Sequence, residues 1–274
     1  MATYLDLART FADETDLSVW QRLVGSFRTL DHIVPDAART HLQGFVRSLV
    51  GPVHHHLGNH VDDEADRTSS LRSLLFEALG QLGADESIRG RARDLHEQGA
   101  AEPGSVNPDL FDGAVRVIAS SGDEATFDDF IQRSKEAKTP QDKLRYLGAL
   151  ADSPSASVIQ RLLALTLTDE IRTQDAPFVL RRSIINRDQG PAAWGFVHRH
   201  WDEINDRFPS NSIPRLLDGI RVITDPAVAA DVEAFLAEHP VPQGARIVAQ
   251  HLERMQVSVS LRKREAEALA DALR

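Results

Sequence analysis

The fold is decided by residues 107–166, which read NPDLFDGAVRVIASSGDEATFDDFIQRSKEAKTPQDKLRYLGALADSPSASVIQRLLALT. Residues that start helices recur in this stretch roughly 14 to 16 positions apart: Asn107-Pro108, Asp123, Thr139-Pro140 and Ser153-Pro154. Proline suits the first helical position because its missing N–H would be unpaired there. The preceding polar side chain can accept a hydrogen bond from a free N–H of the first turn. The stretch therefore predicts a series of short helices.

Apolar residues between these starts recur at the spacing of three and four that one face of a helix requires. Four such stripes are Leu110, Ala114, Val117 and Ile118; Phe127, Phe130 and Ile131; Ile159, Leu162 and Leu163; and Val228, Val232, Phe235 and Leu236. Further starts are indicated at Asp225-Pro226, at Asp175 with Pro177 and at Ser212 with Pro214. From Gln243 to the end no breaker occurs, which predicts one long helix.

Two helices and their turns occupy about 30 to 40 residues, which is the period of α-solenoids built from helix pairs. We therefore predict an all-α fold, a HEAT-like α-solenoid in which antiparallel helix pairs form a superhelix. Two stretches are predicted to be loops, Gly58 to Thr68 and Gly99 to Asn107. Because neither is long enough to require a domain boundary, we predict a single helical-repeat domain over residues 1–274.

The composition excludes several classes of function. The formal net charge of −10 disfavours binding to nucleic acid, and we interpret Arg181-Arg182 and Arg262-Lys263-Arg264 as ordinary solvated helix positions. The chain has no cysteine, which excludes disulfides, thiolate zinc sites and a cysteine nucleophile. Residues 1–11 carry Asp6 and Arg9 within an apolar run and are neither a signal peptide nor a membrane span. We expect a cytoplasmic protein that binds no membrane.

Metal binding has little support in the sequence. His54, His55 and His56 are adjacent, so on a helix they point about 100° apart and cannot all reach one ion. His60 follows a predicted helix end at Gly58. His96-Glu97 begins the zinc-hydrolase motif, but Ala100 stands where the second histidine is needed. We predict no metal site in this chain.

Catalytic constellations are also missing. No nucleophile elbow, phosphate-binding glycine loop or dinucleotide fingerprint occurs. Neighbouring carboxylates such as Asp62-Asp63-Glu64 are interpreted as a solvated surface. His198 and His200 flank an apolar stripe that we predict to be core: Trp194, Val197, Trp201, Ile204 and Phe208. We therefore expect no catalytic residue and no enzyme activity from this chain by itself.

A resemblance to a known family rests on residues 168–208. This stretch contains Ile171-Arg172, Gln174-Asp175, Gly190, Ala193-Trp194 with Phe196, and Trp201-Asp202-Glu203. It resembles the C-terminal helical domain of the zinc aminopeptidases of the aminopeptidase N and puromycin-sensitive aminopeptidase family. Other pieces agree in order along the chain: Val19-Trp20, Phe45-Val46, Leu57-Gly58, Leu71-Arg72, Leu82-Gly83 and His239-Pro240. The sequence departs from the family pattern at Asn59 and Phe111.

The resemblance implies a non-catalytic role. In the family this domain is a bowl of helix pairs that closes over a zinc-containing catalytic domain and limits the access of peptides. The implied partners are that catalytic domain and the peptide substrate, and zinc is expected in the catalytic domain only. We expect the chain to be either an excised domain or a stand-alone relative. The alternative function is an independent helical-repeat scaffold that binds a protein partner.

Three polar residues are the candidates for substrate binding: Arg172, Gln174 and Asp175. The guanidinium of Arg172 is well shaped to attract a peptide carboxylate. The structural alternative, which we favour, is that Asp175 caps a helix while Arg172 and Gln174 brace the preceding turn.

Overall fold

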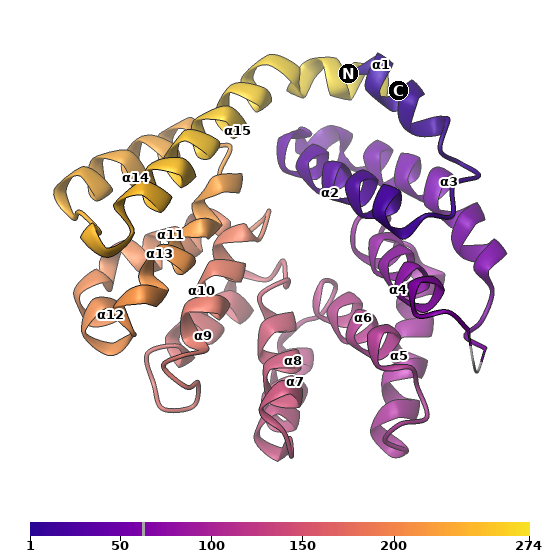
Figure 1. Cartoon of the computed structure of the whole chain (residues 1–274), viewed down its shortest axis with the longest axis horizontal. Coiled ribbons are helices and arrows are strands. Elements are labelled where there is room, and N and C mark those ends of the chain that lie inside the picture. The colour runs from indigo at the N-terminus through magenta and orange to yellow at the C-terminus, as the bar shows by residue number, and fades with distance from the viewer. Residues whose placement is uncertain (62–63) are drawn as a thin grey trace. The chain divides into compact units, whose positions relative to one another are not determined.

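The computed structural model describes residues 1–61 and 64–274, and these residues form fifteen α-helices and four short 3-10 helices, with no β-strand among them. The predicted all-α class is confirmed. The chain divides into two compact units (Figure 1), the first made of Met1–Ile118 with Arg264–Arg274 and the second of Ala119–Lys263. The solenoid repeat and the single domain over 1–274 remain predictions.

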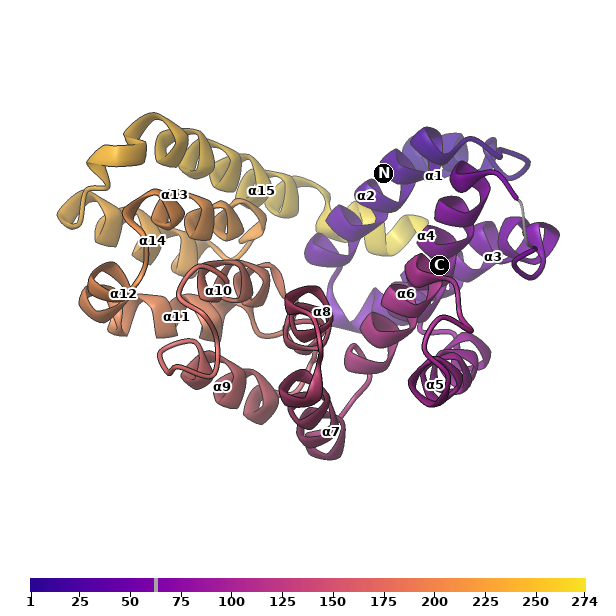
Figure 2. The same ribbon diagram turned by 60° about the horizontal axis from the view of Figure 1, so that its bottom comes forward.

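The first unit is built around α4, which packs against α2, α3 and α5. Figures 1 and 2 show α2 and α3 beside α4 in both views. Apolar residues of α4, α5 and α6 form a buried cluster that includes Phe76, Leu95 and Val117. The elements are α1 (Ala2–Arg9), α2 (Leu17–Ile33), η1 (Asp36–Ala38), α3 (Arg39–Leu57), α4 (Asp66–Gln81), α5 (Glu86–Ala101), α6 (Pro108–Ala119) and the end of α15 (Ala245–Ala272).

The second unit is built around α10, which packs against α8, α9, α11, α13 and η3. The helix α14 lies beside α15, where Gln256 donates a hydrogen bond to Glu233 at 2.7 Å (Figure 1). The elements are α7 (Glu124–Glu136), α8 (Pro140–Leu150), α9 (Ala156–Leu165), α10 (Ala176–Ile185), α11 (Gly190–Arg199), α12 (Trp201–Arg207), η2 (Ser210–Ser212), α13 (Ile213–Leu216), η3 (Leu217–Val222), α14 (Pro226–Glu238), η4 (Pro242–Gly244) and most of α15.

Most of the predicted helix starts are confirmed. The side chains of Asp123, Thr139 and Asp225 each accept a hydrogen bond from the first turn of the helix that follows. The start at Ser153 is wrong by two residues, because Ser155 caps α9. The hydroxyl of Ser153 instead accepts a hydrogen bond from the Ser155 N–H at 3.2 Å, which stabilises the turn before the helix.

Both predicted loops are shorter than expected. The first ends at Ala65 because α4 begins at Asp66, and its residues Asp62 and Asp63 lie outside the described part of the chain. The second begins after Ala101, so Gly99 belongs to the last turn of α5. A Cβ at Gly99 would lie 2.6 Å from the ring of Phe111, and the glycine therefore permits close packing of α5 on α6.

The predicted core stripe from Trp194 to Phe208 is confirmed. Its five members are all buried, with exposed fractions between 0 and 8%. The stripe does not lie on one helix, however, because the backbone of His200 departs from helical geometry between α11 and α12. The stripe packs against α14, where the ring of Phe235 meets Trp194 and Trp201 edge to face at 5.7 and 5.4 Å.

Candidate ligand-binding groove

The three residues predicted to bind substrate lie in the turn before α10, and the structure brings only two of them together. Nε of Arg172 donates a hydrogen bond to the carboxylate of Asp175 at 2.5 Å. Asp175 occupies the N-cap position of α10, but its side chain makes no capping hydrogen bond. Gln174 is exposed. The structural role of Arg172 is therefore to hold Asp175, and a contact with peptide remains a prediction for all three residues.

The basic pair Arg181-Arg182 remains 40 and 29% exposed, but both side chains also make ion pairs within the second unit, which the interpretation of the sequence did not include. Nε of Arg181 donates to Asp218 at 2.7 Å, across from α10 to η3. Arg182 donates two hydrogen bonds to the carboxylate of Asp152, at 3.0 and 2.6 Å. In the second basic cluster, Arg262 donates to the hydroxyl of Thr224 at 3.2 Å. These side chains fix neighbouring elements of the second unit to one another.

A pocket opens beside Arg181. It has a volume of about 420 Å³ and lies between α10, α13 with η3, and the start of α15. A second pocket of about 420 Å³ follows along α15, and the two share His251. We call the two together the α15 groove, whose lining residues are Phe178, Arg181, Asn211, Pro214, Arg215, Asp218, Arg221, Gln243, Ile247, Gln250, His251, Glu253, Arg254 and Val257.

The α15 groove gathers exposed apolar side chains. Phe178, Ile247 and Val257 are 46, 49 and 50% exposed, and they are three of the five large hydrophobic residues exposed in the described part of the chain. Single exposed apolar residues are ordinary on protein surfaces, but a group of them in a concave site is typical of a binding surface.

An ion-pair cluster forms the floor of the groove. Asp218 accepts hydrogen bonds from Arg181 at 2.7 Å and from Arg221 at 2.6 Å. Burial raises the pKa of Asp218, but the hydrogen bonds from Arg221 and Arg181 outweigh it, and the pKa lies below its usual value. Burial lowers the pKa of His251, whose Nε2 lies 3.2 Å from the carbonyl oxygen of Pro214. The floor is thus a charged carboxylate held by two arginines beside a neutral imidazole.

Two further arginines of the groove are available to a ligand. Arg215 and Arg254 are exposed, and neither guanidinium makes an ion pair or hydrogen bond with another described residue. The groove therefore carries four arginines and two carboxylates, although the whole chain has a formal charge of −10. Its local charge is opposite in sign to that of the protein.

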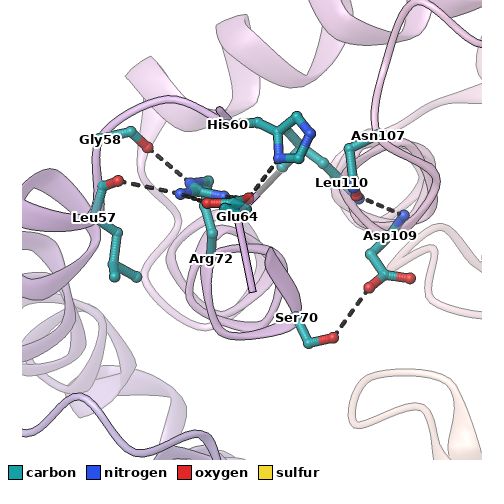
Figure 3. Close-up of polar contacts among 9 residues, drawn as sticks. All are labelled: Leu57, Gly58, His60, Glu64, Ser70, Arg72, Asn107, Asp109 and Leu110. Atoms are coloured by element: carbon teal, nitrogen blue, oxygen red, sulfur yellow. Dashed lines mark hydrogen bonds and ion pairs between the residues drawn. The ribbon is translucent and has the colours of Figure 1, made fainter. Parts of the chain in front are cut away.

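His60, which follows the end of α3, lies in a cluster of ion pairs with Glu64 and Arg72. Nδ1 of His60 lies 2.5 Å from Oε1 of Glu64, and both oxygens of Glu64 accept from Arg72 (Figure 3). Arg72 also donates to the carbonyl oxygens of Leu57 and Gly58. Glu64 is thus a partner of a buried arginine, contrary to the predicted solvated surface. In residues 1–61 and 64–274 no three histidine, aspartate or glutamate side chains could hold an ion, so these residues do not fit a zinc site.

The comparison with protein families decides the assignment. Residues 1–257 match the model of the family described as the ERAP1-like C-terminal domain. The chain belongs to this family. The match covers the first unit up to Ile118 and most of the second, including the α15 groove. The resemblance stated from the sequence motifs is thereby confirmed.

Relatives of this ERAP1-like C-terminal domain are aminopeptidases. It is 28% identical over 270 residues to aminopeptidase M1-C of Oryza sativa subsp. japonica. This alignment covers 94% of this chain and 30% of that protein. It is 25% identical to aminopeptidase M1 of Arabidopsis thaliana, over 95% of this chain and 30% of that protein. It is 24% identical to glutamyl aminopeptidase of Rattus norvegicus, over 97% of this chain and 29% of that protein. The chain thus spans less than a third of these relatives and matches their C-terminal part.

Sequence reasoning missed the α15 groove of this ERAP1-like C-terminal domain. One signal was present: Ile247 and Val248 are adjacent apolar residues on the long last helix, so they lie about 100° apart around its axis and face different directions. Val248 is buried and Ile247 is 49% exposed. No helix of the described chain is both long enough and apolar enough to cross a membrane.

Proposed function

We propose that this chain is the non-catalytic C-terminal domain of a zinc aminopeptidase, which caps the active-site chamber and controls the access and binding of peptide substrates. The observation that carries the proposal is the family match over residues 1–257, together with relatives whose C-terminal part alone is matched. The zinc would be held by the catalytic domain. We place the protein in the cytoplasm, which accords with a chain that lacks cysteine.

Arg172 supports a contact with peptide. Only its Nε is engaged with Asp175, and its side chain is 43% exposed. The two remaining nitrogens of the guanidinium can donate to a carboxylate. We propose Arg172 as the contact, with Asp175 as the residue that positions it and exposed Gln174 beside it.

A chimera tests the function. The C-terminal part of aminopeptidase M1 from Arabidopsis thaliana is replaced by this chain, and hydrolysis of aminoacyl chromogenic substrates is compared with hydrolysis of longer peptides. We expect the chimera to discriminate between substrates by length, whereas the same enzyme truncated before this region does not. A chimera that behaves like the truncated enzyme contradicts the capping role. Turnover by the isolated chain with added zinc contradicts the non-catalytic assignment.

The α15 groove favours one alternative, an independent helical-repeat scaffold that binds a protein partner, because it exposes apolar side chains beside unpaired arginines. The same chimera separates the two functions. A scaffold would leave peptide-length selection at the level of the truncated enzyme.

A further inference from the structure

We propose that the corner where α3 meets α4 is a pH-sensitive switch: when His54 takes up a proton, the last turn of α3 separates from α4. The corner consists of the α3 residues that follow Pro52 and of the face of α4 that carries Arg72 and Phe76. It lies wholly within the first unit, and the inference is independent of the proposed function.

Arg72 joins the last turn of α3 to α4. Pro52 lies inside α3 and has no N–H, so the helix lacks one of its backbone hydrogen bonds just before this turn. Nε and Nη2 of Arg72 donate to the carbonyl oxygens of Gly58 and Leu57, at 2.9 and 3.2 Å (Figure 3). The position of the last turn therefore depends on the guanidinium of Arg72.

His54 faces the same side of α4 as Arg72. Its ring lies 6.0 Å from the ring of Phe76, which follows Arg72 by four residues and so shares a face of α4 with it. The imidazole is partly buried and makes no hydrogen bond within residues 1–61 and 64–274. A neutral imidazole can remain against Phe76, whereas an imidazolium there would lack a partner for its charge.

The surroundings of His54 oppose a positive charge. Burial lowers the pKa of His54 from 6.5, and the guanidinium of Arg72 and the neighbouring His55 lower it further. Asp85, which precedes α5, raises the pKa of His54, but its carboxylate already accepts hydrogen bonds from two N–H groups of the first turn of α5. The net direction is downward, so His54 is neutral in the closed corner at pH 7.

Other groups that would favour a charge on His54 are already engaged. Carbonyl oxygens at the end of a helix favour a cation, but the two that end α3 accept from Arg72. Both carboxylate oxygens of Glu64 also accept from Arg72, and one of them contacts Nδ1 of His60. A charge on His60 would thus face Glu64, whereas a charge on His54 would face Arg72.

Acid should therefore open the corner. The open corner takes up a proton on His54 near the ordinary pKa of 6.5, whereas the closed corner resists the proton until a lower pH. The free energy that keeps the corner closed is complete above pH 6.5 and is lost as the pH falls from 6.5 through the pKa of the closed state. This window lies above that of Glu64, whose pKa is lowered from 4.5, so the two effects are separate.

Hydrogen–deuterium exchange of the whole chain, followed by mass spectrometry, measures the opening. Rates are compared at about pH 7.5 and about pH 5.5, on either side of the ordinary pKa of histidine, and each is divided by the intrinsic rate at that pH. We expect peptides that cover the last turn of α3 to lose protection several-fold in acid, while peptides from α7, which has no histidine, keep theirs. Unchanged protection at the end of α3, or an equal loss in α7, overturns the proposal.

Matched variants assign the effect to His54. His54→Gln and His54→Phe both remove the titrating group, and the second keeps a ring against Phe76. In both variants we expect protection at the end of α3 to be the same at the two pH values. Each variant is compared with itself, so a change in its overall stability does not enter.

His55→Gln and His60→Gln are the controls, because His55 is exposed on the same helix and His60 faces Glu64. Both should retain the loss of protection seen in the parent. A loss that persists in both His54 variants, or that disappears in either control, contradicts the assignment.

Nuclear magnetic resonance of the imidazole signals tests the cause. In the parent, the signal of His54 should titrate with a midpoint below 6.5. A midpoint at or above 6.5 would show that the closed corner accepts the charge, and it would overturn the proposal whatever the exchange rates.

Discussion

Two arginines show how differently the two units use the same side chain. Arg72 in the first unit is buried, with a side chain 5% exposed, and each of its three side-chain nitrogens donates to Glu64 or to a backbone carbonyl (Figure 3). Arg215 in the second unit is exposed, without a partner, in a pocket with half-exposed apolar walls. The first arrangement is a closed cluster and the second is an open one.

The difference follows from the cost of desolvating a charge. A buried guanidinium is tolerated only when carboxylates and carbonyls replace its water, so Arg72 requires Glu64 and the carbonyls of Leu57 and Gly58. Gly58 presents its carbonyl from a backbone with φ of +61°, a conformation that glycine adopts without strain. Arg215 keeps its water and can exchange it for a ligand. The closed cluster therefore serves stability, whereas the open one is available to a ligand.

The largest expected effect is that of Arg72→Met. The substitution leaves Glu64 and two carbonyls without their main donor, and removing one partner of a buried pair costs about 3 to 5 kcal/mol in the free energy of unfolding. Urea denaturation followed by circular dichroism measures the loss.

The matched control is Arg67→Met on the same helix. Arg67 pairs with Asp16 at 3.0 Å, but the two side chains are 62 and 48% exposed, so this substitution should cost about 1 kcal/mol or less. A loss at Arg72 no larger than the loss at Arg67 would show that the cluster does not stabilise the first unit.

The sequence predicted the buried contacts of both units better than the exposed groove of the second unit. The motif pieces Leu57-Gly58 and Leu71-Arg72 were recognised separately, and the structure shows that Arg72 donates to the carbonyls of Leu57 and Gly58. The stripes around Phe127, Ile159 and Trp194 are buried as predicted, because helical periodicity reports burial directly. The cap at Ser155 was missed, since two serines flank Pro154 and the local sequence allows either of them to cap the helix.

The α15 groove could not be predicted in the same way. Phe178, Arg215 and Ile247 lie on three elements that are far apart in sequence, and no local pattern places them around one pocket. Arg181 and Arg182 read alike in the sequence, yet one faces Asp218 and the other Asp152. Periodicity indicates which side of a helix is buried, but it does not indicate which exposed residues of different helices meet.

The next largest expected effect on stability concerns the contact between η3, which carries Asp218, and α10, which carries Arg181. A Cβ at Gly219 would lie 2.7 Å from the carbonyl oxygen of Arg181 and 2.9 Å from Cβ of Ile184. Gly219→Ala should therefore push η3 away from α10 and cost about 1 to 3 kcal/mol in the free energy of unfolding.

Gly148→Ala is the control in the same unit. The nearest atom to a Cβ there, Nη1 of Arg182, is 3.5 Å away, and the residue lies inside α8. Alanine is favoured over glycine in a helix by about 1 kcal/mol, so this variant should be at least as stable as the parent. Equal destabilisation by the two variants would argue against a tight contact between η3 and α10.

The smallest effect concerns acid, and it compares the carboxylates of the two clusters. The hydrogen bond from Arg72 holds the pKa of Glu64 below its ordinary value of 4.5, and the pKa of Asp218 is lowered from 3.8 by Arg221 and Arg181 against burial. A lowered pKa in the folded state contributes stability that is complete above the ordinary pKa and is lost as the pH falls through the folded one. The free energy of unfolding should therefore fall as the pH drops below about 4.5 in the parent.

Two variants divide this loss of stability between the clusters. Glu64→Gln tests the contribution of the closed cluster and Asp218→Asn that of the open cluster, each in urea titrations from pH 7 to pH 3. Each variant should be less stable than the parent at pH 7 and should lose less stability in acid, since the group that takes up the proton is gone. In both groups hydrogen bonds from arginines lower the pKa against the effect of burial, so each variant should show a shallower dependence on pH than the parent. The contrary outcome is a free energy of unfolding that falls with pH at the same rate in the parent and in Glu64→Gln. That result would show that the two carbonyls alone hold Arg72, and that Arg72 differs from Arg215 only in being buried.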